Sequence, residues 1–177
     1  YNDKALEVFS LSPASAEAAL WQAFLQNKKA DCSTINPELV FLFRSETAMV
    51  LEHLLKTQND WLLKYQLALI YKDRNREAEC RQLLLSCGNE PSYAPFYATR
   101  SAIFKDSDTT QCLSDLQKAL SLDKAQWRYY KMLGEYYNEH QQHEKALVVV
   151  APFYKAHPEQ YIMGMLYAKT LMLNKKY

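Results

Sequence analysis

Two histidines and two glutamates near residue 140 have the residue types of a metal site. His140 and His143 form an H-x-x-H pair, with Glu139 and Glu144 on either side of it. Imidazole and carboxylate groups at this spacing could ligate zinc or nickel. The same residues also fall in a polar turn between two predicted helices, where exposed histidines need no ligand to explain them. We therefore predict no metal site and no cofactor.

The cysteines are the candidates for nucleophilic chemistry. Cys32, Cys80, Cys87 and Cys112 contain no C-x-x-C pair and no zinc-finger spacing, and no G-x-S-x-G motif offers a serine nucleophile. A thiol on a buried helix face is a poor thiolate and behaves as a small hydrophobe. We predict reduced, structural cysteines, no catalytic residue and no enzymatic activity. Cys32, in an irregular segment, is expected to be the most reactive of the four.

Aromatic residues interleave with basic ones at residues 127–131, a pattern that could stack nucleic-acid bases. The whole chain has 21 Lys and Arg against 20 Asp and Glu, a formal charge of +1. This near-neutral balance gives no argument for nucleic acid or for an anionic membrane. Apolar runs are far shorter than the roughly 20 residues that span a bilayer. The pattern therefore indicates helix core, with no nucleic-acid partner and no membrane span.

The composition favours helices. Only 3 of the 177 residues are glycine, which excludes folds built on glycine loops, and strong helix formers dominate. The clearest pattern covers 127–160, where Leu133-Gly134, Tyr137, Ala146 and Pro158 fit two helices, at about 125–139 and 143–156. Small residues at 134 and 146 let two helices cross closely, and Pro158 ends the second.

This pattern resembles the tetratricopeptide repeat, a 34-residue helix-turn-helix unit. Steps of 34 residues reach Tyr161 and Tyr93, although Thr99-Arg100 stands where Leu-Gly is expected. More loosely, the chain is similar to large bacterial repeat proteins with an upstream domain of unknown function. The resemblance implies an all-α fold, an α-α superhelix of stacked two-helix units.

The predicted organisation is a single solenoid over 1–177. Its parts are the end of a preceding repeat at 1–12, an irregular unit at 15–58 with an insertion at 31–44, repeats at 61–92, 93–126 and 127–160, and the first helix of a truncated repeat at 161–177. Because the chain opens without Met in an apparent mid-helix, we expect it to be part of a longer protein. Cysteine usage points to the cytoplasm, with a periplasmic or secreted setting left open.

The resemblance places the partner-binding surface on the concave face, lined by the first helices. That face would present Tyr65, Lys72, Tyr97, Lys105, Arg128, Lys131, Glu135, Asn138, Met165 and Lys169. Four of the cations face a single carboxylate, so this surface suits an acidic, partly hydrophobic peptide or a domain of the same chain. We predict a non-enzymatic protein-interaction scaffold. Two alternatives stay open: a structural repeat region of a larger bacterial enzyme or carbohydrate-handling protein that packs intramolecularly, and a small-ligand pocket walled by tyrosines.

Overall fold

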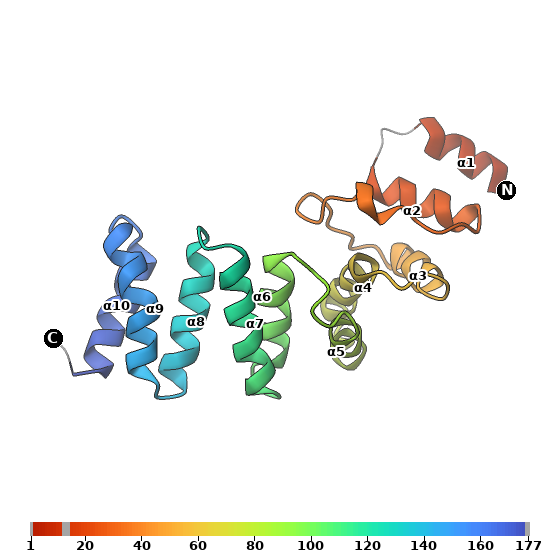
Figure 1. Ribbon diagram of the computed structural model, residues 1–177. Helices are drawn as coiled ribbons and strands as arrows, with labels where there is room; N and C mark the ends of the chain where they lie inside the picture. The colour runs from red at the N-terminus through yellow and green to blue at the C-terminus, as the bar shows by residue number, and fades with distance from the viewer. Residues whose placement is uncertain (1, 12–14, 176–177) are drawn as a thin grey trace. The chain divides into compact units, whose positions relative to one another are not determined.

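The chain folds into helices. The structure is a computed structural model that describes residues 2–11 and 15–175, and those ranges contain no strand (Figure 1). The helices are α1 (Asn2–Leu11), α2 (Ala16–Leu25), the 3₁₀ helix η1 (Cys32–Thr34), α3 (Ser45–Leu54), α4 (Trp61–Asp73), α5 (Glu77–Ser86), α6 (Ala94–Phe104), α7 (Thr109–Leu122), α8 (Trp127–Glu139), α9 (His143–Ala156) and α10 (Tyr161–Leu173). Among the described residues, none of these helices is long and apolar enough to cross a membrane. The predicted all-α fold class is confirmed.

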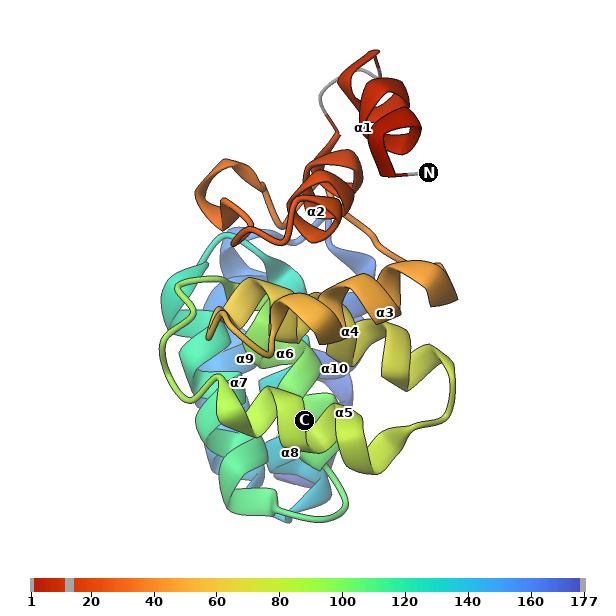
Figure 2. The same ribbon diagram turned by 90° about the vertical axis from the view of Figure 1, so that its right-hand side faces the viewer.

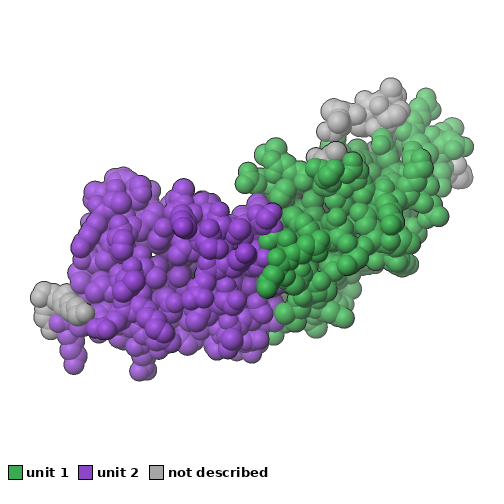
Figure 3. Space-filling model, in the orientation of Figure 1, with its two compact units in different colours: residues 1–91 green, residues 92–177 purple. Residues whose placement is uncertain are grey.

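The chain divides into two compact units, coloured green and purple in Figure 3. Unit 1 is Tyr1–Pro91 and unit 2 is Ser92–Tyr177. The predicted repeat range 61–92 holds α4 and α5, both of which lie in unit 1. Within unit 2, range 93–126 holds α6 and α7, and range 127–160 holds α8 and α9. The single solenoid over 1–177 and its repeat boundaries stay predictions.

In unit 2, α8 and α9 form the helix pair with the clearest sequence pattern. The turn between them uses Gln141, whose φ of 58° lies in the left-handed region. The amide of Gln142 then donates to the carbonyl of Tyr137 at 2.8 Å, the bond of a Schellman C-cap. Gly134 brings the two helices together, because a Cβ at this position would lie 2.5 Å from Val150 Cγ2.

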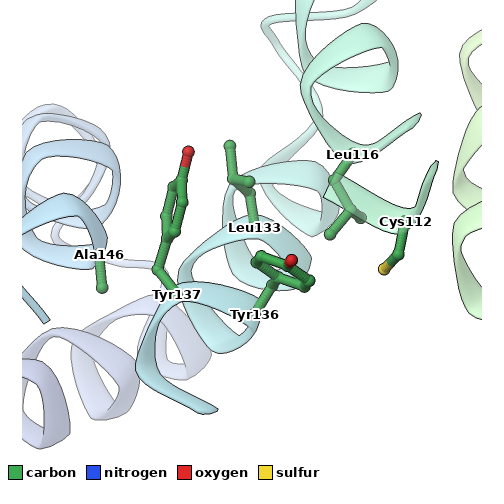
Figure 4. Close-up of a cluster of buried hydrophobic side chains, with 6 residues drawn as sticks. All are labelled: Cys112, Leu116, Leu133, Tyr136, Tyr137 and Ala146. Carbon is green, nitrogen blue, oxygen red and sulfur yellow. The ribbon is translucent and has the colours of Figure 1, made fainter. Parts of the chain in front are cut away.

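A buried cluster joins α7, α8 and α9 (Figure 4). Its six members are Cys112, Leu116, Leu133, Tyr136, Tyr137 and Ala146. Ala146 is fully buried where the sequence predicted a small residue. Burying this apolar surface supplies the main driving force for stacking the three helices.

The pair α6 and α7 is joined by a buried ion pair. Arg100 Nε and Nη2 donate to the two carboxylate oxygens of Asp115 at 2.8 and 2.7 Å. Both side chains are almost completely buried, and Gln111 Nε2 also donates to Asp115 Oδ1 at 3.0 Å. Arg100 therefore occupies the place where the repeat pattern expects glycine, because a carboxylate on the next helix compensates its charge.

In unit 1, α3 packs against α4 and α4 against α5 (Figure 2). The predicted insertion at 31–44 contains only η1, and residues 40–44 have no regular structure. Helix α3 begins directly after this segment, at Ser45, and ends at Leu54.

Candidate functional site

A pocket of about 150 Å³ lies in unit 2 between α6, α7 and α8. It is lined by Ser101, Ala102, Lys105, Cys112, Leu116, Met132, Glu135, Tyr136 and Glu139. The four α8 residues at 132, 135, 136 and 139 follow the spacing of one helix face, so a single regular helix places them together. We call this the α6–α8 pocket.

Two ion pairs form the rim of the α6–α8 pocket. Lys105 Nζ lies 2.8 Å from Glu139 Oε2, and Lys131 Nζ lies 2.8 Å from Glu135. The hydrogen bond from Lys105 to Glu139 raises the pKa of the lysine above its ordinary value. All four side chains are partly or largely exposed, and such pairs contribute about 0–1 kcal/mol to stability. A charged ligand can therefore exchange with them at little cost to the fold.

The floor of the pocket is apolar, and its one thiol is a poor nucleophile. Cys112 and Leu116 are buried there, and the hydroxyl of Tyr136 donates to the carbonyl of Thr109 at 2.9 Å. Burial, assisted by the charge of Asp115, raises the pKa of the Cys112 thiol to about 11. A thiol with this pKa is protonated at neutral pH, so this floor favours packing against an apolar side chain over nucleophilic attack.

Three of the predicted partner-binding residues are buried, which corrects the prediction that they are accessible. Tyr65 and Tyr97 are 5% and 0% exposed, and Asn138 is 8% exposed. Asn138 Nδ2 donates to Thr170 Oγ1 at 2.9 Å and ties α8 to α10. The predicted helices that contain these residues are present in the structure. The periodicity predicted that the three side chains face solvent, whereas they pack inside their units.

The other predicted residues are spread over the two units. Lys105 and Glu135 line the α6–α8 pocket, and Lys131 forms an ion pair with Glu135. Arg128 is exposed at the start of α8, with its guanidinium carbon 4.9 Å from the ring centroid of Trp127. Exposed Met165 and Lys169 lie on α10, and exposed Lys72 lies on α4 in unit 1.

The sequence analysis missed the second carboxylate of the site. It set the predicted cations against Glu135 alone, whereas Glu139 also lies at the rim and pairs with Lys105. The signal was present, because Lys105 and Glu139 are 34 residues apart, one repeat length. Met132 and Tyr136 were missed as well, although they share the α8 face of Glu135.

The histidines near residue 140 have partners within the fold. His140 Nδ1 lies 2.8 Å from the carbonyl oxygen of Tyr136, and His143 Nδ1 lies 3.3 Å from Asn138 Oδ1. Across residues 2–11 and 15–175, no group of three or more His, Cys, Asp and Glu side chains could hold a metal ion.

All four cysteines are free thiols. Burial of Cys80 and Cys112 agrees with the predicted small core positions. Cys32 was expected to be the most reactive, and this stays a prediction: Cys32 is half-buried whereas the other three are buried, but its thiol is also held protonated. Burial, together with the charge of Asp60, raises the Cys32 pKa to about 12, which disfavours the reactive thiolate.

Comparison with known proteins identifies the fold. No protein-family model matches the chain, and no curated protein matches it in sequence. Solved structures do match it. YrrB, "a TPR protein with an unusual peptide-binding site", aligns with a TM-score of 0.66 at 13% identity over 99% of this chain and 86% of its own. The protein MamA aligns with a TM-score of 0.63 at 16% identity over 73% and 78%. TTC0263, a thermophilic TPR protein in Thermus thermophilus, aligns with a TM-score of 0.56 at 21% identity over 97% and 91%.

Proposed function

The chain has the fold of the tetratricopeptide-repeat proteins, and from that premise we propose that it is a non-enzymatic protein-interaction scaffold. Its unit 2 binds a peptide on the side formed by α6, α8 and α10. The observation that carries the proposal is the α6–α8 pocket, an apolar floor with a rim of exchangeable ion pairs. The peptide-binding site of the similar protein YrrB supports a peptide as the ligand.

The chemistry of this surface specifies the peptide. The pocket accepts one aliphatic side chain, because its floor is apolar and its volume is about 150 Å³. Arg128 and Lys169 have no carboxylate partner among the described residues. An acidic residue near the aliphatic anchor would supply one, and exposed Met165 adds apolar surface on α10. We therefore propose an acidic peptide with one aliphatic anchor.

A random peptide display library selected against the chain tests this proposal. We expect enrichment of sequences with one aliphatic residue and neighbouring Asp or Glu. Ala102→Trp fills the pocket from an exposed position and should raise the Kd of a selected peptide by at least about tenfold, or 1.4 kcal/mol. Ser114→Trp, on exposed α7 surface outside the pocket, is the matched control and should leave the Kd unchanged.

The charge part of the proposal has its own variants. Arg128→Glu with Lys169→Glu should weaken binding and reduce its dependence on salt, whereas Lys118→Glu on α7 should do neither. Failure to select any peptide, or equal binding by Ala102→Trp and wild type, would contradict the proposal.

A second candidate function follows from the outer surface of α10. Tyr161, Met165 and Met172 are 74%, 58% and 68% exposed, and their spacing places them on one side of the helix. This apolar side favours the alternative in which the repeats are a structural part of a larger enzyme or carbohydrate-handling protein. In that case a selected peptide should bind the 177-residue chain but not a longer natural protein that contains it.

A further inference from the structure

A buried glutamine on α4 binds the backbone of the segment that leads into α3. Gln66 is 2% exposed. Its Nε2 donates to the carbonyl of Val40 at 3.1 Å, and its Oε1 accepts from the amide of Leu42 at 3.5 Å. The side-chain amide thus takes the place of a peptide group on a neighbouring strand. Both bonds go to backbone groups of the segment, so they select an extended chain and not a particular sequence.

A second α4 side chain holds the same segment further along. Arg74, the C-cap of α4, donates from Nη2 to the carbonyl of Phe43 at 3.3 Å. Gln66 and Arg74 are eight residues apart, a spacing that places them on one side of the helix. One side of α4 therefore binds the backbone of residues 40–43 at both ends of the segment.

The side chains of residues 40–43 alternate in burial. Leu42 is 8% exposed and Val40 is half-buried, whereas Phe41 and Phe43 are 73% and 67% exposed. Every second side chain thus packs on the protein, and the backbone forms hydrogen bonds with α4. A bound extended peptide has this arrangement, in which main-chain hydrogen bonds supply affinity and alternate side chains supply specificity.

The α4 surface that holds the segment has an equivalent in unit 2. Helices α4 and α8 each have 13 residues and begin with Trp61 and Trp127, so their equivalent residues are 66 positions apart. Gln66 is then the equivalent of Met132, which lines the α6–α8 pocket. The same helix face lines an open pocket in unit 2 and is covered by residues 40–43 in unit 1.

We propose that this α4 surface is a peptide-binding site that the chain fills with its own residues 40–43. The segment acts as an intramolecular ligand, and its release admits an extended peptide of another protein. That peptide has two apolar residues two positions apart, in the places of Val40 and Leu42. The inference concerns unit 1 and does not rest on the peptide proposed for unit 2.

Release of the segment leaves the helices intact. Residues 40–44 have no regular structure, and side chains of α4 make the three hydrogen bonds described above. Of the described residues 40–43, only Leu42 is buried. A segment held by few buried contacts opens locally at a lower cost than the helices that it covers. An intramolecular ligand weakens the apparent affinity for a competing peptide in proportion to the fraction of chains in which it stays bound.

A synthetic peptide of residues 36–44 tests the proposal. Leu39→Thr, Phe41→Thr and Phe43→Thr in this peptide replace exposed side chains and keep it soluble, and a fluorophore at its N-terminus reports binding by anisotropy. In the 177-residue chain, Leu42→Asp removes the buried anchor and should release the segment. We expect this variant to bind the peptide at least about tenfold more tightly than wild type does.

Two further variants of the segment control for the substitution itself. Leu39→Asp changes a side chain that is 78% exposed, and this variant should bind the peptide as weakly as wild type does. Val40→Asp removes the other inward side chain and should act in the same direction as Leu42→Asp. The circular dichroism spectra of all three variants should match wild type, because residues 39, 40 and 42 lie outside the helices. A peptide that itself carries Leu42→Asp should bind to none of them.

The role of Gln66 is tested in the released chain. Gln66→Leu combined with Leu42→Asp keeps a side chain of similar size but removes both hydrogen bonds, which leaves backbone groups of a bound peptide without partners. This double variant should bind the peptide at least about tenfold more weakly than Leu42→Asp alone. Ala102→Trp combined with Leu42→Asp is the control, because it fills the α6–α8 pocket, and should bind as Leu42→Asp does.

Hydrogen exchange gives an independent measure of release. The protection of the Leu42 amide in wild type, followed by NMR, reports the fraction of chains in which the segment is open. The ratio of the peptide Kd values of wild type and Leu42→Asp should equal this protection factor, because both quantities describe one opening equilibrium.

Three results would overturn the inference. They are the absence of peptide binding by every variant, equal binding by wild type and Leu42→Asp, and undiminished binding by the double variant with Gln66→Leu. If Leu42→Asp changes the circular dichroism spectrum, Val40→Asp takes its place in each of these comparisons.

Discussion

The helix pairs α6/α7 and α8/α9 of unit 2 are held together by different interactions at one equivalent position. Arg100 and Gly134 are 34 residues apart and occupy equivalent places in their pairs. In α8/α9 the glycine lets Val150 approach to a distance that no Cβ would allow. In α6/α7 a buried arginine fills the same place and binds Asp115 through two hydrogen bonds. Close approach and a buried ion pair can therefore serve at the same position of a repeat.

The two pairs also differ in their turns. The α8/α9 turn places Gln141 in the left-handed region, a conformation that glycine or asparagine adopts more readily. The structure describes every residue of the α6/α7 turn, 105–108, and none of them has a left-handed backbone conformation. The Asp108 amide there donates to the carbonyl of Phe104 at 2.9 Å, and its carboxylate accepts from the amide of Gln111 at 2.9 Å and caps α7. The α6/α7 pair, which has arginine in place of glycine, therefore closes its turn with local hydrogen bonds and without a residue in the left-handed region.

A buried ion pair specifies a geometry more than it stabilises a fold. Removing two charges from water costs about as much as their attraction returns, so a hydrophobic replacement of both is often neutral or stabilising. Removing one partner alone leaves a buried charge without compensation and costs far more. The comparison of the pairs therefore predicts a large asymmetry between single and double substitutions.

The largest expected effect comes from breaking the α6/α7 ion pair. Asp115→Ala should lower the free energy of unfolding by about 3–5 kcal/mol, because Arg100 stays buried without its partner. The double variant Arg100→Met with Asp115→Leu should recover most of this loss. Urea unfolding followed by circular dichroism gives both values. A double variant as unstable as Asp115→Ala would show that the pair itself holds the two helices together.

The next effect belongs to the α8/α9 pair. Gly134→Ala should lower the free energy of unfolding by about 2 kcal/mol, because the added methyl group overlaps Val150 Cγ2 and crowds Leu166. Combination with Val150→Ala should cost less than the sum of the two single variants, since the second change removes the overlap. Additive costs in this double-mutant cycle would contradict the proposed close approach.

The sequence predicted the α8/α9 pair well because its signals are local. Leu133-Gly134, Ala146 and Pro158 lie within one repeat, and the predicted second helix at 143–156 has the observed bounds. The α6/α7 pair was less clear. Thr99-Arg100 departs from the pattern, and its compensation by Asp115 depends on a contact between two helices. A pattern of single positions does not contain such pairwise information.

The candidate site was predicted in part for the same reason. Helix periodicity placed Lys105, Lys131 and Glu135 on accessible faces. It misplaced Asn138, because α10 covers that part of α8 and binds it through Thr170. Exposure of a helix face depends on the next helix in the stack, which the offsets within one repeat do not describe.

The smallest expected effect comes from a third difference between the two pairs. Helix α7 has Cys112 at the position where α9 has Ala146. Burial raises the Cys112 pKa from 9.0 to about 11 in the native state. As the pH rises from 9 to about 10, the unfolded chain loses the thiol proton while the native chain keeps it, so stability falls with pH. This contribution should be about 1 kcal/mol over that interval and absent from Cys112→Ala, after the cost of the substitution at neutral pH is subtracted. Urea unfolding of both proteins at the two pH values measures it, and other groups that titrate in this interval cancel in the difference. An equal loss in both proteins would mean that the Cys112 thiol is ionised as readily in the native state as in the unfolded chain.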